Sequence, residues 1–358
     1  MKLIHCADVH LDSALKTHLT PEKARERRAE LLDDFCSLPD YAQRNGVSAI
    51  LIAGDLFDIP HPTKRTLNRV REAISSHPDI VFFYLPGNHD LTVSLWEKGS
   101  EPGNLHVFGA EWQTVPLGEV TVSGSTVPDA ASLSLDPAAL NIVLLHGTAV
   151  TSAAKPENDE FPIPAFANRG IDYLALGHIH KRQSVPCDRF DGRCTARYCG
   201  CLGGRGFDEC GEKGFLLLET LPGKRIASEF VPWGKRTLRS VPVDLTGCDS
   251  QSEAGTRALA AVVDLPAQDL IRVVLTGELD PSFSPDAVLI ERNLAGRFWF
   301  VQVRDETRLA IHPEDYRHDI SLKGEFIRLV LASELDEAQK NRVIGCGLRA
   351  LYGEDPGL

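Results

Sequence analysis

The segment from residue 80 to residue 90 constrains the fold of this chain more than any other. Residues 80–85 are an apolar run with the length of a buried strand. The run leads into a Pro-Gly turn and then into Asn88, His89 and Asp90. A strand that carries polar, metal-capable side chains at its carboxyl end is typical of the sites of open α/β sheets. These residues alone could equally form an ordinary polar turn, so the interpretation depends on the rest of the chain.

Four further predicted strands end in the same kind of side chain. They are residues 2–7, 47–53, 141–145 and 171–176, followed by Asp8 and His10, Asp55, His146, and His178 and His180. One histidine at a strand end is usually structural, but five strand ends of this kind are difficult to explain as independent accidents. Asp8 and His10 stand two residues apart, so they share one face of an extended segment and form a chelating pair.

The order of the elements predicts an α/β fold. Residues 21–45 and 63–77 have helical patterns between the first three strands, and Pro39 is expected to divide the first of them. A β-α-β-α-β order predicts parallel strands with right-handed crossovers. Residues 96–124 are predicted to form a meander of short strands on the far half of the sheet. Further antiparallel strands are predicted to complete it, at residues 183–185, 196–198 and 214–219.

The pattern changes near Arg239, which predicts a division into domains. Residues 1–237 contain all the strand ends described above and form the predicted catalytic domain. Residues 238–320 alternate strand and helix patterns and are predicted to form a small α/β cap domain. Residues 321–358 are a predicted C-terminal helical segment with an amphipathic pattern.

Composition and charge exclude several classes of protein. Apolar residues make up 43% of the chain and charged residues 25%, as in ordinary soluble proteins. No apolar run reaches a membrane span, and the N-terminus has too short an apolar stretch for a signal peptide. We therefore expect a cytoplasmic protein whose cysteines are reduced. The net charge of −12 argues against wholesale charge-driven binding of nucleic acid.

One part of the chain departs from this acidic average. Residues 181–239 hold 12 Lys and Arg against 7 Asp and Glu, which makes this stretch +5. A local basic surface in an acidic protein suits a phosphate ligand held at one place. An ordinary solvated surface explains the same charges equally well.

The candidate ligands point to a pair of divalent cations. Aspartate, asparagine and imidazole without thiolate suit Mn²⁺, Fe²⁺ or Zn²⁺ better than Ca²⁺ or a structural zinc, and Mn²⁺ is our first choice. Two ions about 3.5–4 Å apart clamp a phosphoryl group and lower the pKa of a bound water. A carboxylate between them is a natural role for Asp55. The reaction class is then in-line hydrolysis of a phosphoester.

The motifs, taken in order, resemble those of the calcineurin-like metallophosphoesterases. They are Asp8-x-His10, Gly54-Asp55-x-x-Asp58, Gly87-Asn88-His89-Asp90, His146-Gly147 and Gly177-His178-x-His180. Further details are similar to the SbcD-type DNA repair nucleases, with the YhaO-like branch as the best fit: residues 8–13, 104–109, 204–207 and 213–214. The resemblance covers residues 1–220 and implies a two-sheet sandwich flanked by helices, with a smaller α/β cap and C-terminal helices.

The resemblance also implies a role for each site residue. One cation would be held by Asp8, His10, Asp55 and His180, and the other by Asp55, Asn88, His146 and His178. His89 would orient the scissile phosphate or protonate the leaving oxygen, with Asp90 tuning its imidazole. The alternative for His89 is a structural hydrogen bond.

The implied function is hydrolysis of DNA as a repair exonuclease, with endonuclease activity as an addition. The cap would seat DNA over the metals, and residues 321–352 would dock an SbcC-like coiled-coil ATPase. Packing on the chain's own core explains their apolar stripe equally well. A homodimer is a further alternative, and no membrane contact is expected. The competing functions are a phosphatase or cyclic-nucleotide phosphodiesterase with the same metal core, or a catalytically silent scaffold.

One feature departs from the resemblance. Five cysteines crowd 24 residues: Cys187, Cys194, Cys199, Cys201 and Cys210. Their spacing does not match a paired Cys-x-x-Cys zinc site. We expect free thiols on neighbouring strands, with zinc or another soft metal as the alternative.

Overall fold

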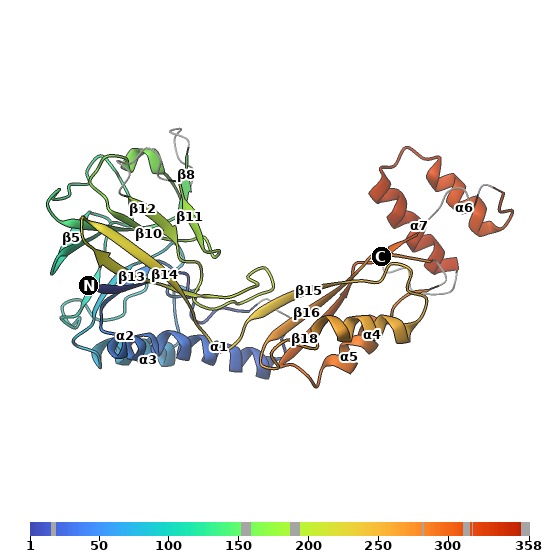
Figure 1. Ribbon diagram of the computed structural model, residues 1–358, viewed down its shortest axis with the longest axis horizontal. Coiled ribbons are helices and arrows are strands. Elements are labelled where there is room, and N and C mark those ends of the chain that lie inside the picture. The colour runs from blue at the N-terminus through green and yellow to red at the C-terminus, as the bar shows by residue number, and fades with distance from the viewer. Residues whose placement is uncertain are drawn as a thin grey trace. The chain divides into compact units, whose positions relative to one another are not determined.

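The first 237 residues fold around two six-stranded sheets that pack face to face (Figure 1). The computed structural model describes residues 1–15, 19–151, 159–186, 194–280, 283–310, 316 and 318–351. The chain divides into two compact units, Met1–Thr237 and Leu238–Leu358. The predicted fold class, a two-sheet α/β sandwich flanked by helices, is confirmed.

The first sheet is built on the predicted parallel strands. Its order is β14 (Arg225–Pro232), β13 (Gly214–Leu221), β1 (Lys2–Cys6), β2 (Val47–Ala53), β3 (Val81–Leu85) and β4 (Leu105–Val107). Strands β1 to β4 run parallel, whereas β13 and β14 are antiparallel additions beyond β1. The central strands are almost wholly buried because both faces of the sheet are covered, which explains their continuous apolar sequences.

The second sheet has a parallel centre and antiparallel edges. Its order is β11 (Gln183–Val185), β12 (Thr195–Tyr198), β10 (Tyr173–Gly177), β7 (Leu140–His146), β6 (Val120–Gly124) and β5 (Gln113–Leu117). Strands β12, β10, β7 and β6 are parallel, and β11 and β5 are antiparallel to their neighbours. Its outer face is covered by the segment with β8 (Thr148–Val150), β9 (Glu160–Pro162) and the short η1 helix (Ile163–Phe166).

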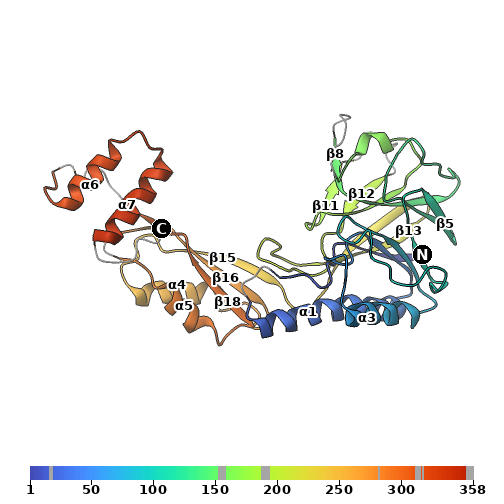
Figure 2. The ribbon, with the colours of Figure 1, turned by 180° about the vertical axis from the view of Figure 1, so that it is seen from behind.

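Three helices cover the outer face of the first sheet. They are α1 (Pro21–Cys36), α2 (Leu38–Arg44) and α3 (Lys64–Ser75), and the view from behind in Figure 2 shows α1 and α3 on one side of the strands. Helix α3 begins where Thr63 caps the backbone N–H of Thr66. The predicted division of the first helix is confirmed. It falls at Ser37, so Pro39 stands in the first turn of α2, where its missing N–H costs nothing.

Two predicted strand arrangements were wrong. Strand β4 pairs in parallel with β3 in the first sheet, so residues 96–124 form no single meander. Strand β12 is parallel to β10, and β13 belongs to the other sheet. Local apolar patterns identify a strand but not its partner, because pairing is decided by contacts between segments far apart in the chain.

The second unit alternates strands and helices as predicted. Three parallel strands, β15 (Leu238–Asp244), β16 (Leu270–Thr276) and β18 (Phe300–Asp305), alternate with α4 (Gln251–Val262) and α5 (Ala287–Leu294). A small parallel pair, β17 (Glu278–Leu279) and β19 (Arg308–Leu309), follows the sheet. Helices α6 (Leu322–Leu331) and α7 (Glu337–Leu351) pack on each other through Ile327, Ile344 and their neighbours. A separate third segment from residue 321 stays a prediction.

Among the described residues, no helix combines the length and apolarity that crossing a bilayer requires. The predicted cytoplasmic location stays a prediction.

A buried histidine between the two sheets makes stability depend on pH. His5 is fully buried, and its Nδ1 lies 3.1 Å from the Tyr173 hydroxyl. Burial lowers the pKa of His5 from 6.5 to about 3. Between these values the unfolded chain binds a proton that the folded chain does not, so the free energy of unfolding falls as pH falls from 6.5.

We expect His5→Leu to remove this dependence. Between pH 6.5 and 4.5 the wild-type protein should lose about 2–3 kcal/mol through His5 alone. Urea unfolding of both proteins at pH 7 and pH 4.5 measures the difference. An equal loss in the two proteins would show that His5 is not the group responsible.

Candidate metal centre

The carboxyl ends of β1, β2 and β3 meet those of β7 and β10 from the other sheet. The segments after β1 and β2 run side by side, because Asp8 N–H donates to Gly54 O at 3.1 Å and His10 N–H to Asp55 O at 2.9 Å. His146 Nδ1 lies 2.9 Å from Ala53 O, which joins the end of β7 to the end of β2. The structure thus brings all seven predicted ligands to one place.

The backbone at this place is strained. Four of the predicted ligands have positive φ: Asp8 at 50°, His10 at 49°, Asp55 at 50° and His178 at 98°. Such conformations cost about 1–3 kcal/mol each for residues other than glycine. The surrounding packing must hold them, and strain of this kind gathers at functional sites.

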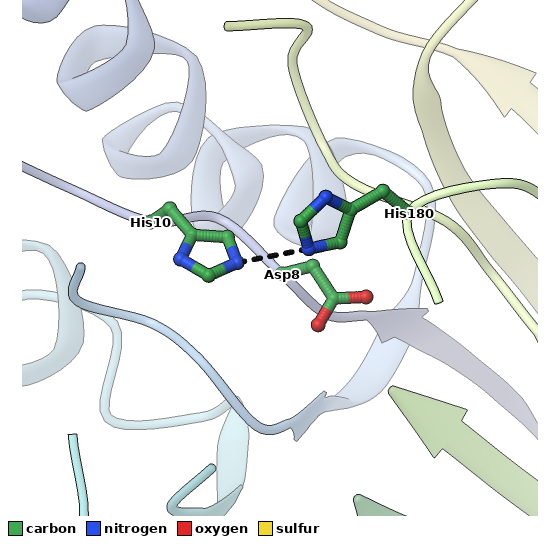
Figure 3. A group of neighbouring side chains, drawn as sticks. All are labelled: Asp8, His10 and His180. Atoms are coloured by element: carbon green, nitrogen blue, oxygen red, sulfur yellow. Dashed lines mark hydrogen bonds between the residues drawn. The ribbon is translucent and has the colours of Figure 1, made fainter. Parts of the chain in front are cut away.

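Asp8, His10 and His180 form the first group of converging side chains (Figure 3). The Nε2 atoms of His10 and His180 face each other at 3.1 Å. Asp8 is fully buried, and its Oδ1 accepts the His178 N–H at 2.8 Å. Its other oxygen, Oδ2, is buried without a hydrogen-bond partner in the described part of the chain. A buried carboxylate oxygen costs free energy unless something compensates it, and a cation would do so.

The second group is Asp55, His146 and His178, with Asn88 beside it. His146 Nε2 lies 3.3 Å from Asp55 Oδ2 and 3.0 Å from Asn88 Oδ1. Asp55 Oδ2 is also 3.6 Å from His10 Nε2, so this one oxygen stands between the two groups. Asp8 also approaches the second group, but less closely, with its Oδ1 4.0 Å from His146 Nδ1.

The charges at the centre are strongly coupled. Burial raises the pKa of Asp8 to about 6, against the opposing influence of His146. Burial also opposes ionisation of Asp55, but the contact with His146 outweighs it and holds the pKa of Asp55 well below its usual range. In return Asp55 raises the pKa of His146 to about 9, against the effect of burial. Asp55 therefore favours a proton on His146, and a bound cation would take the place of that proton.

Three of the histidines have an oxygen atom beside Nδ1. These are Ala53 O for His146 at 2.9 Å, Glu209 Oε1 for His180 at 2.8 Å and Asp58 Oδ1 for His10 at 2.8 Å. At His146 and His180 this oxygen accepts a hydrogen bond and favours the tautomer that leaves the Nε2 lone pair available, whereas the close contact of His10 Nδ1 with Asp58 Oδ1 lacks hydrogen-bond geometry. The donor set of imidazole nitrogens and carboxylate and amide oxygens, together with the uncompensated Asp8 oxygen, fits divalent cations.

His89 lies beside these groups with an accessible imidazole, and its ring lies close enough to His10 and Asp58 for the three to form a further group that could hold a cation. Its side chain is 43% exposed, and its backbone N–H donates to Asp55 Oδ1 at 3.1 Å. Its Nδ1 lies 3.3 Å from Asp58 O and 3.6 Å from Asp58 Oδ1. His89 also stands edge-on to His10, with ring centroids 5.0 Å apart.

The role predicted for Asp90 requires correction. Asp90 is fully buried, and its carboxylate accepts hydrogen bonds from Phe57 N–H, Tyr84 O–H and Gly87 N–H at 3.0, 2.6 and 2.7 Å. These contacts tie the loop after β3 to the loop after β2. The carboxylate next to the His89 imidazole is that of Asp58 instead.

The sequence reasoning missed three residues of this centre. Arg205 and Glu209 line a cavity of about 270 Å³ together with Asp58, His89 and His180. Asp58 and Arg205 belonged to recognisable motifs but had no assigned contact. Glu209 carried no sequence signal, because an isolated glutamate in a Gly-rich loop has no pattern that places it.

The predicted cysteine cluster is not supported as a metal site. Cys187 lies outside the described residues. Cys199 and Cys201 are buried free thiols, and burial raises the pKa of Cys201 to about 12. Within the described ranges, no candidate ligand group includes a cysteine.

A glycine at the centre makes room for Asp55. A Cβ at Gly87 would lie 2.1 Å from Asp55 Oδ1 and 2.6 Å from the Asp55 backbone nitrogen. Gly87→Ala is therefore expected to lower the free energy of unfolding by about 1–3 kcal/mol through overpacking. Gly109→Ala is the matched control, because a Cβ there meets nothing within 4 Å. Urea unfolding of both variants tests this, and equal stabilities would contradict it.

Sequence comparison with known proteins also matches this chain to phosphoesterases. The sequence profile of the calcineurin-like phosphoesterases matches residues 1–182. The chain is 30% identical to the uncharacterized metallophosphoesterase YhaO of Bacillus subtilis, over 64% of this chain and 60% of that protein. It is 25% identical to the DNA double-strand break repair protein Mre11 of Aeropyrum pernix, over 73% of this chain and 68% of that protein.

A third relative aligns along almost the whole chain. It is one of the subunits of the nuclease SbcCD from Escherichia coli, and it is 24% identical over 96% of both chains. The profile match covers the five segments that carry the candidate ligands. The segment with Arg205 and Glu209 lies beyond it.

Proposed function

Because this chain belongs to the calcineurin-like phosphoesterase family, we propose that it is a two-metal nuclease that hydrolyses phosphodiester bonds of DNA. Membership of this family identifies the chain as a metal-dependent phosphoesterase. The DNA substrate and the exonuclease action are the finer part of the proposal. The observation that supports the two-metal function is the convergence of the predicted ligands around Asp8. The Oδ2 atom of this buried carboxylate has no hydrogen-bond partner among the described residues.

We assign the ligands to two positions that share Asp55. Asp8, His10 and His180 would hold one cation with Asp55, and Asn88, His146 and His178 would hold the other with it. We propose Mn²⁺, with Fe²⁺ and Zn²⁺ as the alternatives, because imidazole and oxygen donors without thiolate suit all three ions. When bound, such a pair of cations supplies Lewis-acid stabilisation of the phosphoryl oxygens and activation of water.

The chain's own residues supply positioning and a proton. Asp55 would position the two groups of ligands relative to each other, because one oxygen of its carboxylate lies close to both His10 and His146. His89 is exposed beside the ligands and belongs to neither proposed ligand set, so it is placed to contact a phosphate oxygen and to protonate the leaving oxygen. The backbone oxygen of Asp58, 3.3 Å from His89 Nδ1, would hold the orientation of the ring. General acid catalysis of this kind contributes about 10²–10⁴-fold.

The names of the relatives support a DNA substrate. One is a DNA double-strand break repair protein and another is part of a nuclease. The basic stretch of residues 181–239, which contains part of the site, suits a polyanion.

Because the Escherichia coli relative is named as one component of SbcCD, we also propose an SbcC-like ATPase partner, docked through α6 and α7. The cap role of residues 238–320 and a homodimer stay predictions.

End-labelled linear DNA tests the proposal. We expect the purified protein to degrade it with Mn²⁺ and to be inactive with excess chelator. Binding should weaken steeply as salt rises, because several phosphates are contacted at once. Preference for a cyclic nucleotide or a phosphomonoester over DNA would favour the competing enzyme functions. If none of these substrates is hydrolysed with Mn²⁺, Fe²⁺ or Zn²⁺, only the scaffold remains.

A further inference from the structure

We infer that Arg205 and Glu209 are positioning residues that hold the imidazoles of His10 and His180 for one of the two cations. This inference rests on the proposed metal-dependent function and names residues of the same site. Both residues follow the second sheet and lie outside the segment that the family profile matches.

Glu209 acts on His180 directly. Its Oε1 lies 2.8 Å from His180 Nδ1, so it accepts the N–H and favours the tautomer that leaves Nε2 available. The side chain of His180 is 31% exposed, whereas that of Glu209 is 6% exposed. Packing therefore encloses the imidazole of His180 only in part. The buried carboxylate therefore fixes the direction in which His180 Nε2 points, which is toward His10 Nε2 (Figure 3).

Arg205 joins the carboxylates behind the two imidazoles. Its Nη2 donates to Glu209 Oε1 at 2.7 Å, and its backbone N–H donates to Glu209 Oε2, also at 2.7 Å. Its Nη1 donates to Asp58 Oδ1 at 3.1 Å, and that oxygen lies 2.8 Å from His10 Nδ1. One guanidinium thus sets the positions of both carboxylates, with the fixed fork geometry that lysine lacks.

The loop that carries Arg205 is itself anchored. Arg27 on α1 is 2% exposed and donates through Nη2 to Gly204 O at 2.8 Å. Glu209 N–H donates to Gly206 O at 2.9 Å and closes the turn. The position of Arg205 is therefore set by the helix layer of the first unit.

The second cation position has different supports. His146 is oriented by the backbone carbonyl of Ala53, and Asn88 lies on its other nitrogen. Within the described part of the chain, the side-chain hydrogen bonds of Arg205 and Glu209 reach His180 and Asp58 but no side chain of the second group. Loss of Arg205 or Glu209 should therefore lower the affinity for one cation and leave the affinity for the other unchanged.

Titration of the metal-free, full-length protein with MnCl₂ in a calorimeter measures this without any substrate. We expect two ions in the wild type. Glu209→Leu and Arg205→Met should bind one ion with about 10–100-fold lower affinity and the other unchanged. Glu209→Gln should lie between, because its amide oxygen still accepts the His180 N–H. Glu212→Gln makes the same chemical change at an exposed residue that is not among those lining the cavity, and it should bind as the wild type does.

Each outcome decides the inference. Wild-type binding in Glu209→Leu and Arg205→Met would overturn it, and the proposed nuclease function would stand as long as the wild type cleaves DNA. Equal weakening in Glu212→Gln and Glu209→Gln would also overturn it, because charge and not position would then be responsible. A wild type that binds no divalent ion would end both proposals. If Glu209→Leu does not fold, the comparison of Glu209→Gln with Glu212→Gln decides.

Discussion

Asp55→Asn is expected to lower the rate of Mn²⁺-dependent DNA hydrolysis by about 10³-fold or more. The reason is the position of one oxygen. Asp55 Oδ2 lies 3.3 Å from His146 Nε2 and 3.6 Å from His10 Nε2, between the two groups of ligands. An amide is neutral and a weaker ligand, so both cation positions lose their shared negative charge. Steady-state cleavage of labelled linear DNA at saturating Mn²⁺ measures the effect.

The variant should remain folded, which makes the result interpretable. An asparagine oxygen can still accept the His89 N–H that Asp55 Oδ1 accepts at 3.1 Å. Asp129→Asn is the matched control, because Asp129 is exposed and none of its contacts involves a site residue. Its Oδ1 accepts the Ala131 N–H at a distance of 3.0 Å. If Asp55→Asn kept more than a tenth of the wild-type rate, Asp55 could not be the shared ligand.

The sequence predicted the local elements of the first unit well. Strand β2 has the predicted bounds, and β1 and β3 differ from them by one residue. Buried strands in a parallel sheet need continuous apolar runs, and turns that deliver ligands need Gly, Asp and His, so both leave a signal in the sequence. Within each sheet the convergence of the ligands also followed, because neighbouring parallel strands end at the same edge. The meeting of the two sheets was implied by the family resemblance instead.

What the sequence did not reveal depends on contacts across the fold. The partner of β4 and the sheet of β13 were wrong because pairing is not local. Asp90 and Asp58 have the same chemistry, and only the three-dimensional structure shows that the first ties loops together while the second lies beside His89. Glu209 is 29 residues from His180 in sequence and 2.8 Å from it in space. No local pattern encodes such a contact.

His89→Gln is expected to lower kcat for DNA by about 10²–10⁴-fold while both Mn²⁺ ions bind as in the wild type. The His89 side chain is 43% exposed, and its Nδ1 lies near Asp58, so its removal should leave the two proposed ligand sets intact. His77→Gln is the control, because His77 contacts Asp40 and the end of α3 instead of the site residues. Calorimetric titration with MnCl₂ and steady-state kinetics provide the two readouts.

The leaving group separates the two roles proposed for His89. If its imidazole protonates the leaving oxygen, a nitrophenyl ester of a nucleotide needs no such proton, because nitrophenolate leaves unaided. The deficit of His89→Gln should then shrink at least about 10-fold on the nitrophenyl ester relative to DNA. An equal deficit on both substrates would assign His89 to orienting the phosphate instead. A rate within about 10-fold of the wild type on DNA would exclude His89 from both roles, because either one acts on the group being transferred.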